Sequence, residues 1–265
     1  MENKCLYCYK EINSIELETL AGIEGYHKKC SKSFFGNVTP PVLDFTETQI
    51  LQLAEQVIKS QRTVTGVQPK LSLGLSKEVS TPNRLTIVGL WGSYILKPQT
   101  TLYSNLPEIE DLTMHLAEIS KIKTVPHSLI KLKSGQLAYI TKRVDRNNGE
   151  KSHMEDMCQL TERLTEHKYK GSYEQIANAI KKYTDNPGLD VVDYYELVLF
   201  SFLTGNNDMH LKNFSLLKKD LTYDLCSPST GTPEIGEIIT FIYDSVGGCG
   251  DITGNYPILT YKIQA

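Results

Sequence analysis

The sequence predicts an α+β fold of two lobes with a cleft between them, preceded by a small metal-binding unit. Short β-like runs, punctuated by glycine and proline, occupy residues 63–102, whereas the chain beyond Asn148 has a mostly helical pattern. Strands followed by helices are typical of α+β architectures, and the cleft between two lobes is a common ligand site. Paired cysteine and histidine residues near the amino terminus are the third observation.

The composition is that of an ordinary globular protein. The 265 residues are 40% hydrophobic and 22% charged, with a net charge of -3. This balance gives the chain no overall positive electrostatic potential, so we expect no direct binding of nucleic acid. No run approaches the ~20 apolar residues that span a bilayer, and the amino terminus lacks an apolar signal region. We therefore expect a cytoplasmic protein without a membrane partner.

The first elements follow a proline-containing linker at 37–41. Residues 46–60 carry apolar side chains on one helical face, and Thr46 with Gln49 has the pattern of a capping box. The sequence pattern then changes from helical to strand-like, and β-like runs follow at 70–75, 84–88 and 93–96.

The pattern returns to helix at 106–119, with Leu112, Leu116 and Ile119 on one side. Two further β-like runs, at 129–132 and 136–143, predict a hairpin around a Ser-Gly turn.

The second half of the chain contains an apolar helix at 191–203 and shows no internal repeat. A polar loop from Gly205 to Ser215 follows this helix directly, so the helix anchors the loop.

The amino-terminal cysteines and histidine predict a metal site. Cys5-x-x-Cys8 and His27-x-x-Cys30 form two close pairs separated by 18 residues, which is the spacing of a small tetrahedral Zn²⁺ site. With no base or fifth ligand nearby, we expect a closed structural site that supplies folding energy to a unit too small for its own core. The other three cysteines are scattered, which suits free thiols better than a disulfide framework. The alternative is two accidental cysteines beside a structural histidine.

Two segments in the β-rich half predict contacts to nucleotide phosphates. Residues 63–70 place Gly66 beside hydroxyl side chains, where backbone amides can approach phosphate oxygens, although an ordinary turn has the same composition. Strand residue Lys97 precedes an acidic helix start that includes Glu110. A strand lysine paired with a helix carboxylate holds phosphates in kinase-like sites. The alternative is a solvent-facing lysine at a strand end and acids that favour a helix amino terminus.

The loop after the apolar helix is the strongest indication. Its Asp208 and Asn213 are five residues apart, as in the kinase catalytic loop, where the aspartate accepts the proton of the substrate hydroxyl and the asparagine binds Mg²⁺. A plain loop rich in Asn and Asp is the alternative. The loop follows the other two segments in the order found in kinases.

Five ordered motifs closely resemble the kinase domain of HipA, the toxin half of bacterial toxin–antitoxin pairs. The resemblance covers roughly residues 60 to 220, and the Cys/His head resembles one that precedes this domain in a short subgroup. That subgroup lacks the usual amino-terminal HipA subdomain. The motifs begin at Thr65, Tyr94, Tyr139, His153 and Gly205 and read TGVQPKL, YILKP, YITKRVDR, HMED and GNNDMHLKN.

The resemblance implies a two-lobed, protein-kinase-like fold that uses ATP and Mg²⁺ to phosphorylate Ser or Thr of proteins, including aminoacyl-tRNA synthetases. It implies that Asp208 is the catalytic base and Asn213 a Mg²⁺ ligand. It also implies that Lys97 contacts ATP phosphates, with Glu110 as its ion-pair partner. Further ATP-site positions are Thr65, Gly66, Val67 and Gln68 in the phosphate loop, Tyr139, Thr141, Lys142 and Arg143 at an adenine-facing hinge, and His210 in the catalytic loop.

The resemblance also implies partners and a modification. A protein substrate and a cognate antitoxin of the DNA-binding kind are expected, together with a separately encoded counterpart of the missing subdomain. Thr63 takes the place of the serine that the family autophosphorylates. The resulting segments are a zinc-ribbon-like head at 1–36, a linker and helix at 37–62, a β-rich N-lobe at 63–146, a helical C-lobe at 147–229 and a divergent tail at 230–265.

The tail departs from the family pattern. The family continues with Ser-Pro-x-Tyr-Asp, whose aspartate is the second metal ligand, but here Ser227-Pro228-Ser229 is followed by Thr230-Gly231. Asp224 comes early for that ligand and Asp244 comes late, so we take Asp224 as the candidate for Mg²⁺. We expect a truncated or divergent C-lobe, weak ATP binding and slow transfer.

Two other classes of function remain open from the sequence. An inactive pseudokinase would bind a partner through the same fold, and Mg²⁺-dependent ATP binding with transfer separates it from an active kinase. A zinc-containing adaptor would act through the head, and salt-dependent affinity for DNA would support it.

Overall fold

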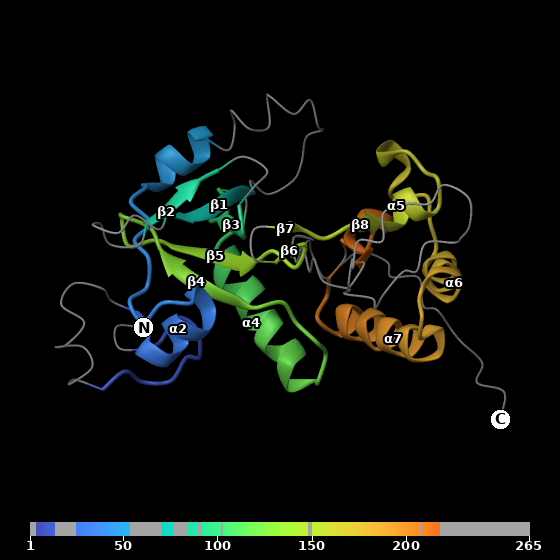
Figure 1. The fold of residues 1–265 in the computed structure, drawn as a ribbon, viewed down its shortest axis with the longest axis horizontal. Helices are drawn as coiled ribbons and strands as arrows, with labels where there is room; N and C mark the ends of the chain where they lie inside the picture. Colours follow the sequence, from blue (N-terminus) through green and yellow to red (C-terminus); the bar gives the residue numbers. More distant parts are fainter. Residues whose placement is uncertain are drawn as a thin grey trace.

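The computed structural model describes residues 4–13, 25–53, 70–76, 84–88, 92–101, 103–147, 150–206 and 208–217. They form two lobes (Figure 1). The sheet lobe contains the Cys/His head, the main sheet and helix α4, and the helical lobe contains α5, α6 and α7. The chain crosses between them through β6 (Arg146–Asn147) and β7 (Glu150–Lys151). The α+β class predicted from the sequence is confirmed.

The main sheet of the described part of the chain has five antiparallel strands in the order β2-β1-β3-β5-β4. All five strands were predicted to within two residues at each end, because each is a short β-like run bounded by turn residues. The central strand β3 places Lys97 opposite Tyr139 of β5. The elements of this lobe are α2 (Lys28–Phe35), β1 (Leu71–Ser76), β2 (Arg84–Ile87), β3 (Tyr94–Pro98), α4 (Leu106–Ile119), β4 (His127–Lys131) and β5 (Leu137–Lys142).

The Cys/His head packs on the sheet. Leu6 and Phe34 of the head belong to the same buried cluster as Leu73, Leu96 and Ile140 of the strands. The backbone N–H of a β4 residue also donates to the Leu6 carbonyl at 3.2 Å. Burial of each such side chain stabilises by about 1.5–3 kcal/mol, so the head and the sheet hold each other in place. The expected boundary at residue 36 stays a prediction.

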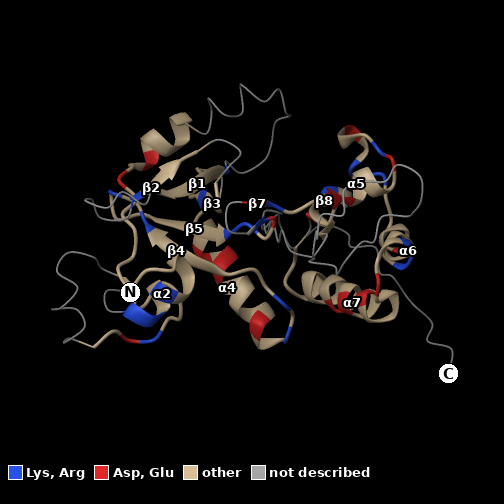
Figure 2. Ribbon diagram, viewed as in Figure 1, with Lys and Arg blue, Asp and Glu red and all other residues tan. Residues whose placement is uncertain are grey.

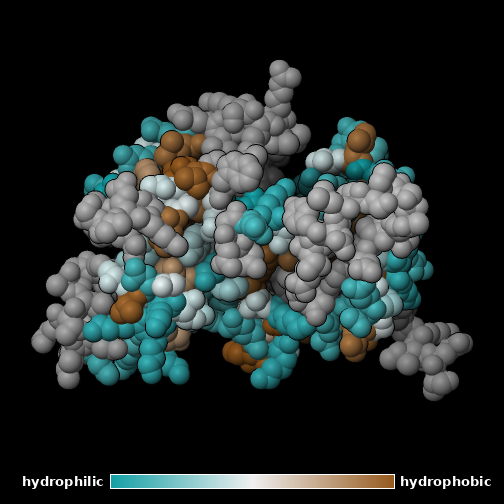
Figure 3. All heavy atoms as spheres, in the orientation of Figure 1, coloured by the Kyte–Doolittle hydropathy of each residue, from teal (hydrophilic) through white to brown (hydrophobic). Residues whose placement is uncertain are grey.

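Helix α4 has the predicted bounds, and Leu112, Leu116 and Ile119 do lie on one side, but that side is exposed. Their exposed fractions are 53%, 42% and 74%, and apolar side chains reach the surface near the carboxyl end of α4 in Figure 3. The opposite side instead buries Glu110 and Asp111 completely. Figure 2 shows acidic residues of α4 close to the sheet. Buried carboxylates need partners, and these come from other elements.

The helical lobe is built around α7, which begins four residues before its predicted start because Pro187 is favourable in a first helical turn. Phe200 of α7 packs with Met114 and Ala117 of α4, so the two lobes share a small apolar cluster. No helix within the described ranges is both long enough and apolar enough to cross a bilayer. The elements are β8 (Met154–Asp156), α5 (Met157–Leu160), η1 (Thr165–His167), α6 (Tyr173–Tyr183), α7 (Pro187–Leu203), η2 (Leu211–Asn213) and β9 (Ser215–Leu217).

The predicted helix at 46–60 is helical over residues 47–53, and residues 54–60 lie outside the described ranges. Its capping box is present, since the Gln49 N–H donates to Thr46 Oγ1 at 3.4 Å and the Thr46 N–H donates to Gln49 Oε1 at 2.9 Å. This local motif was readable from the sequence alone.

Candidate functional site

The predicted pairing of Lys97 with Glu110 is present in the sheet lobe. Lys97 is 2% exposed on β3, Glu110 is fully buried on α4, and the Lys97 ammonium contacts Glu110 Oε1. Lys97 Nζ also lies 5.5 Å from the centroid of the Tyr139 ring. Burying a lysine requires such a carboxylate, because an unpaired charge inside a protein is strongly unfavourable.

A cavity lies beside this ion pair. Its wall combines five apolar side chains with six charged ones, so it can contact both apolar and charged parts of a ligand. The apolar residues are Ile95, Met114, Val125, Val144 and Met154, and the charged residues are Lys70, Lys97, Glu110, Lys142, Arg143 and Asp145.

The expected hinge residues line the same cavity but differ in exposure. Tyr139 is only 2% exposed and stacks on the His127 ring at 6.1 Å. The Thr141 hydroxyl donates to a backbone carbonyl at 3.1 Å, and Lys142 Nζ donates to the Ser33 carbonyl of the head at 3.4 Å. Contacts to the surrounding protein therefore already orient three of these side chains.

A buried aspartate fixes the start of the crossing between the lobes. Arg143 Nε and Nη2 donate to the two carboxylate oxygens of Asp145 at 2.9 and 2.8 Å, and Arg146 donates to the same carboxylate. Burial alone would raise the pKa of Asp145, but the two guanidinium groups outweigh it and hold the pKa below its usual range. The Asp145 carboxylate therefore stays ionised between two arginines at the edge of the cavity.

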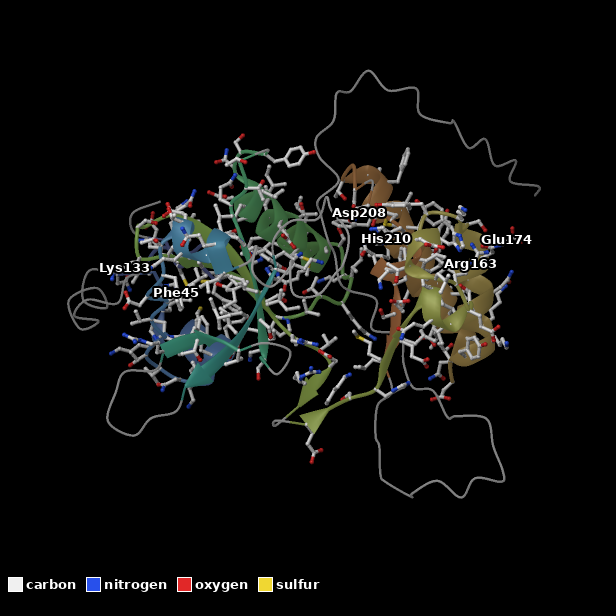
Figure 4. The ribbon with its side chains drawn as sticks, turned by 90° about the horizontal axis from the view of Figure 1, so that it is seen from above. Phe45, Lys133, Arg163, Glu174, Asp208 and His210 are labelled. Atoms are coloured by element: carbon white, nitrogen blue, oxygen red, sulfur yellow. The ribbon has the colours of Figure 1, made fainter. Side chains whose placement is uncertain are left out.

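The predicted catalytic loop brings Asp208, His210 and Asn213 together. The Asp208 N–H donates to Asn206 Oδ1 at 3.0 Å, and Asn213 Nδ2 donates to the Asp208 carbonyl. His210 Nε2 lies 3.5 Å from Asp208 Oδ1. Gly205 ends α7 in the left-handed region, with a φ of 71°, which turns the chain into the loop. In Figure 4, Asp208 lies on the side of the helical lobe nearer the sheet lobe, whereas Glu174 lies on the outer side.

The described lining of the cavity comes from residues 70–154, so it does not include Asp208 or Asn213. Asn207 also lies outside the described ranges. Several predicted site residues cannot be placed because they too lie outside the described ranges, namely Thr63, Thr65, Gly66, Val67, Gln68 and Asp224.

The four predicted zinc ligands converge. One ligand atom from each of Cys5, Cys8, His27 and Cys30 lies within 4.8 Å of the others. His27 Nδ1 lies 3.4 Å from Cys8 Sγ, while its Nε2 lies 3.1 Å from the Glu11 carbonyl. This carbonyl can hold the proton on Nε2, and Nδ1 is then the nitrogen that would bind a metal. Burial and then the neighbouring thiols raise the pKa of Cys30, so a cation would be needed to hold several thiolates here. The donor set fits Zn²⁺.

Two features near the site were not singled out from the sequence. Lys70, the last residue of the predicted phosphate loop, lines the cavity. A second group of possible metal ligands, Asp111, His115 and His127, lies between α4 and β4. An aspartate and a histidine four residues apart on a predicted helix were the available signal, but nothing local indicated that His127 would join them.

Residues 62–234 match the family of HipA-like C-terminal domains, which is more than half of the chain. The match runs past residue 220, where the resemblance in the sequence analysis ended, and includes the first residues of the segment at 230–265 that was expected to be divergent.

Proteins similar to this chain in sequence are named as kinases. A Haemophilus influenzae protein named "Putative kinase" is 25% identical over 252 residues, which are 91% of this chain and 68% of that protein. A Sinorhizobium fredii protein named "Putative kinase Y4dM" is 31% identical over 179 residues, 63% of this chain and 43% of that protein. The chain thus spans less than half of the Sinorhizobium relative.

Solved structures give two further likenesses. HipA of Shewanella oneidensis, solved with HipB and operator DNA, has a TM-score of 0.48 and 24% identity over 62% of this chain and 46% of its own. The Helicobacter pylori proinflammatory kinase CtkA has a TM-score of 0.43 and 15% identity over 64% of this chain and 56% of its own. On the match over residues 62–234, this chain belongs to the family of HipA-like C-terminal domains.

Proposed function

We propose that this chain is a HipA-like protein kinase, which transfers the γ-phosphoryl group of ATP to a Ser or Thr hydroxyl of a protein. The observation that carries the proposal is the buried ion pair of Lys97 and Glu110 beside the cavity. The desolvation of two buried charges can exceed their mutual attraction, so such a pair is a poor device for stability alone. In kinases the same pair, from a strand and a helix, positions the lysine on the nucleotide phosphates.

The sheet lobe would bind the nucleotide. Lys97 would donate to phosphate oxygens while Glu110 holds its ammonium group in place. The apolar wall of the cavity suits an adenine ring, with Thr141 and Arg143 at its edge. Residues 65–68, Tyr139 and Lys142 remain proposed contacts on the family resemblance.

The helical lobe would supply the groups that act on the acceptor. Asp208 would take the proton of the Ser or Thr hydroxyl as its oxygen bonds to the γ-phosphorus and ADP departs. The hydrogen bond from Asn213 Nδ2 to the Asp208 carbonyl orients the amide, so Asn213 Oδ1 is left to bind a cation. Mg²⁺, when bound there, would neutralise charge on the β- and γ-phosphates. His210 would steady the Asp208 carboxylate from 3.5 Å.

The second metal carboxylate determines how active the chain is. Asp224 would have to supply it, and the Thr230-Gly231 pair replaces the Tyr-Asp of the family pattern. This departure favours weak binding of Mg·ATP and slow transfer. It is also the observation that supports the second candidate, a pseudokinase that binds a partner.

Family membership suggests the biological setting. We propose a protein substrate of the aminoacyl-tRNA synthetase type, a toxin role in the cytoplasm and neutralisation by an antitoxin. Thr63 would be the site of autophosphorylation, and the Cys/His head would hold structural zinc. The convergence of the four ligands supports the zinc, and the family resemblance supports the other points.

The test compares Asp208→Asn with Asp193→Asn, a matched change at an exposed position of α7. Purified full chains would be incubated with Mg²⁺ and γ-labelled ATP, and transfer to Thr63 or an added protein would be measured. Asp208→Asn should lower transfer by about 10²-fold or more, as for removal of a general base, with ATP affinity and melting temperature unchanged. Asp193→Asn should match the unaltered chain.

Equal transfer by both variants would refute the role of Asp208. An unaltered chain that binds ATP without Mg²⁺ dependence and shows no transfer would favour the pseudokinase.

A further inference from the structure

Three possible metal ligands that the kinase proposal does not use converge between α4 and β4. One ligand atom from each of Asp111, His115 and His127 lies within 4.8 Å of the other two. Glu118, one helical turn beyond His115, contacts both imidazoles. We propose that these residues, called here the α4–β4 cluster, bind a second divalent metal ion of the first transition row, with Zn²⁺ as the best match.

The fold makes this convergence possible. Asp111 and His115 are four residues apart and therefore lie one above the other on the same side of α4. His127 opens β4, the edge strand of the sheet, with its side chain only 2% exposed against the helix. Two imidazoles and carboxylates form a donor set that zinc and its neighbours accept.

Two distances between candidate ligand atoms suit a tetrahedral ion. His115 Nε2 lies 3.5 Å from Asp111 Oδ2, and His127 Nε2 lies 3.4 Å from Glu118 Oε1. An imidazole binds one ion through one nitrogen, so the 3.3 Å contact of His115 Nδ1 with Glu118 Oε2 would orient the ring. Bonds of about 2.0–2.1 Å to zinc place neighbouring ligand atoms about 3.3 Å apart. His115 Nε2 is buried and makes no hydrogen bond within the described residues, so it is available as a metal ligand.

Supporting contacts hold these side chains in place. His127 Nδ1 lies 2.7 Å from Asp111 Oδ1, the arrangement by which a carboxylate keeps a proton on one imidazole nitrogen and leaves the other to bind metal. The Tyr9 hydroxyl also donates to Asp111, and burial, followed by the Asp111 carboxylate, raises the pKa of Tyr9 well above its usual range. Tyr9 therefore remains a donor and holds the Asp111 carboxylate from the side of the head.

The charge of the cluster also favours a cation. The carboxylates of Asp111 and Glu118 bring two negative charges, and Asp111 is completely buried. A divalent ion supplies two positive charges at one point, which balances both carboxylates.

A metal here would tie α4 to β4 at the residue next to Glu110, and through Tyr9 to the chain that follows Cys8. The existence of the site does not depend on kinase activity. The consequence that the metal would have for catalysis, through the neighbouring Lys97–Glu110 pair, rests on the proposed function.

The experiment uses Co²⁺, a spectroscopic substitute for zinc, on the purified full chain after removal of bound metal. Two equivalents should bind. The equivalent in the Cys/His head produces thiolate-to-metal charge-transfer absorption, and the equivalent in the α4–β4 cluster produces only d–d absorption. Metal content after equilibrium dialysis gives the same count independently of the spectrum.

His115→Gln should bind only the equivalent with thiolate absorption, which also reports that the head is folded. His153→Gln is the matched control, because His153 is exposed beside Glu155 in a similar His–carboxylate contact outside the cluster. It should bind two equivalents. Glu118→Gln, at a half-exposed side chain, should weaken the second equivalent by about 10–100-fold without disturbing the core.

Two results would overturn the proposal. One is an unaltered chain that binds only the ion with thiolate absorption. The other is a second equivalent that persists unchanged in both His115→Gln and Glu118→Gln, since other groups would then hold it.

Discussion

The two lobes position their shares of the candidate site by different means. In the sheet lobe, Lys97 and Glu110 come from a strand and a helix, and Tyr9 reaches Asp111 from 102 residues away. In the helical lobe, Asn206, Asp208 and Asn213 all lie within one short loop and are joined to each other by hydrogen bonds.

This difference predicts that the two halves of the site respond differently to mutation. Long-range contacts form only when the whole lobe is folded, so the sheet half of the site depends on the head and on the packing of α4. Local hydrogen bonds depend mainly on the loop itself. The following changes test that separation, beginning with the largest expected effect.

Removing metal from the Cys/His head should destabilise the entire sheet lobe. Binding of structural zinc supplies about 10 kcal/mol or more of folding free energy in small zinc-binding peptides, and here Leu6 and Phe34 carry the head into the core of the sheet. Chelation, or Cys8→Ser, should increase amide hydrogen exchange in β1, β3 and β5 and leave α6 protected. Mass spectrometry of the exchanged protein measures both lobes at once.

Cys158→Ala is the control for loss of a thiol, since Cys158 belongs to the core of the helical lobe. It should leave exchange in β3 unchanged. Unchanged exchange in β3 and β5 after chelation would instead show that the head is an independent appendage.

Replacing the buried ion pair should separate stability from function. Glu110→Leu alone leaves Lys97 without this carboxylate and should cost about 3–5 kcal/mol of unfolding free energy. The double change Lys97→Met with Glu110→Leu should recover most of that loss, because apolar residues of similar volume replace buried pairs well. Denaturant unfolding checks both.

Phosphate transfer should nevertheless be lost in the double variant as in each single one, since no group then holds the phosphates. A stable double variant with normal transfer would mean that the pair is structural only.

Asp145→Asn should remove a pH-dependent contribution to stability. The pKa of Asp145 is lowered in the folded protein, so its ionised form stabilises the fold above the unfolded pKa of about 3.9, and this contribution is lost as pH falls through the folded value. At neutral pH the change should cost about 1.5–3 kcal/mol, as for hydrogen bonds to a charged group. Thermal melts from pH 7 down to pH 3 should show the variant and the unaltered chain converging. A constant difference over that range would contradict the assignment.

Asn206→Ala should have the smallest effect on stability. It removes the 3.0 Å hydrogen bond to the Asp208 N–H and should cost about 0.5–1.5 kcal/mol. Transfer should fall because Asp208 is less well held, whereas ATP affinity, which belongs to the sheet lobe, should not change. Isothermal calorimetry with ATP decides the point, and a parallel loss of affinity would show that the two lobes are coupled through the loop.

Several local features were correctly predicted from the sequence. The bounds of α4, the β4–β5 hairpin and the capping box at Thr46 depend on residues that are close in the chain. The convergence of the Cys/His ligands was predictable for a related reason, because paired spacing leaves few ways to close a loop around an ion. The Lys97–Glu110 pair followed from a family pattern rather than from periodicity.

The sequence by itself determined where the elements lie and which residue types could do chemistry. Only the tertiary structure decided which side of α4 is buried, since the apolar side at Leu112 faces solvent and the side with Glu110 and Asp111 faces the sheet. Apolar periodicity could not indicate this choice. A carboxylate can be buried only where Lys97, His127 and Tyr9 meet it, and those partners come from distant parts of the chain.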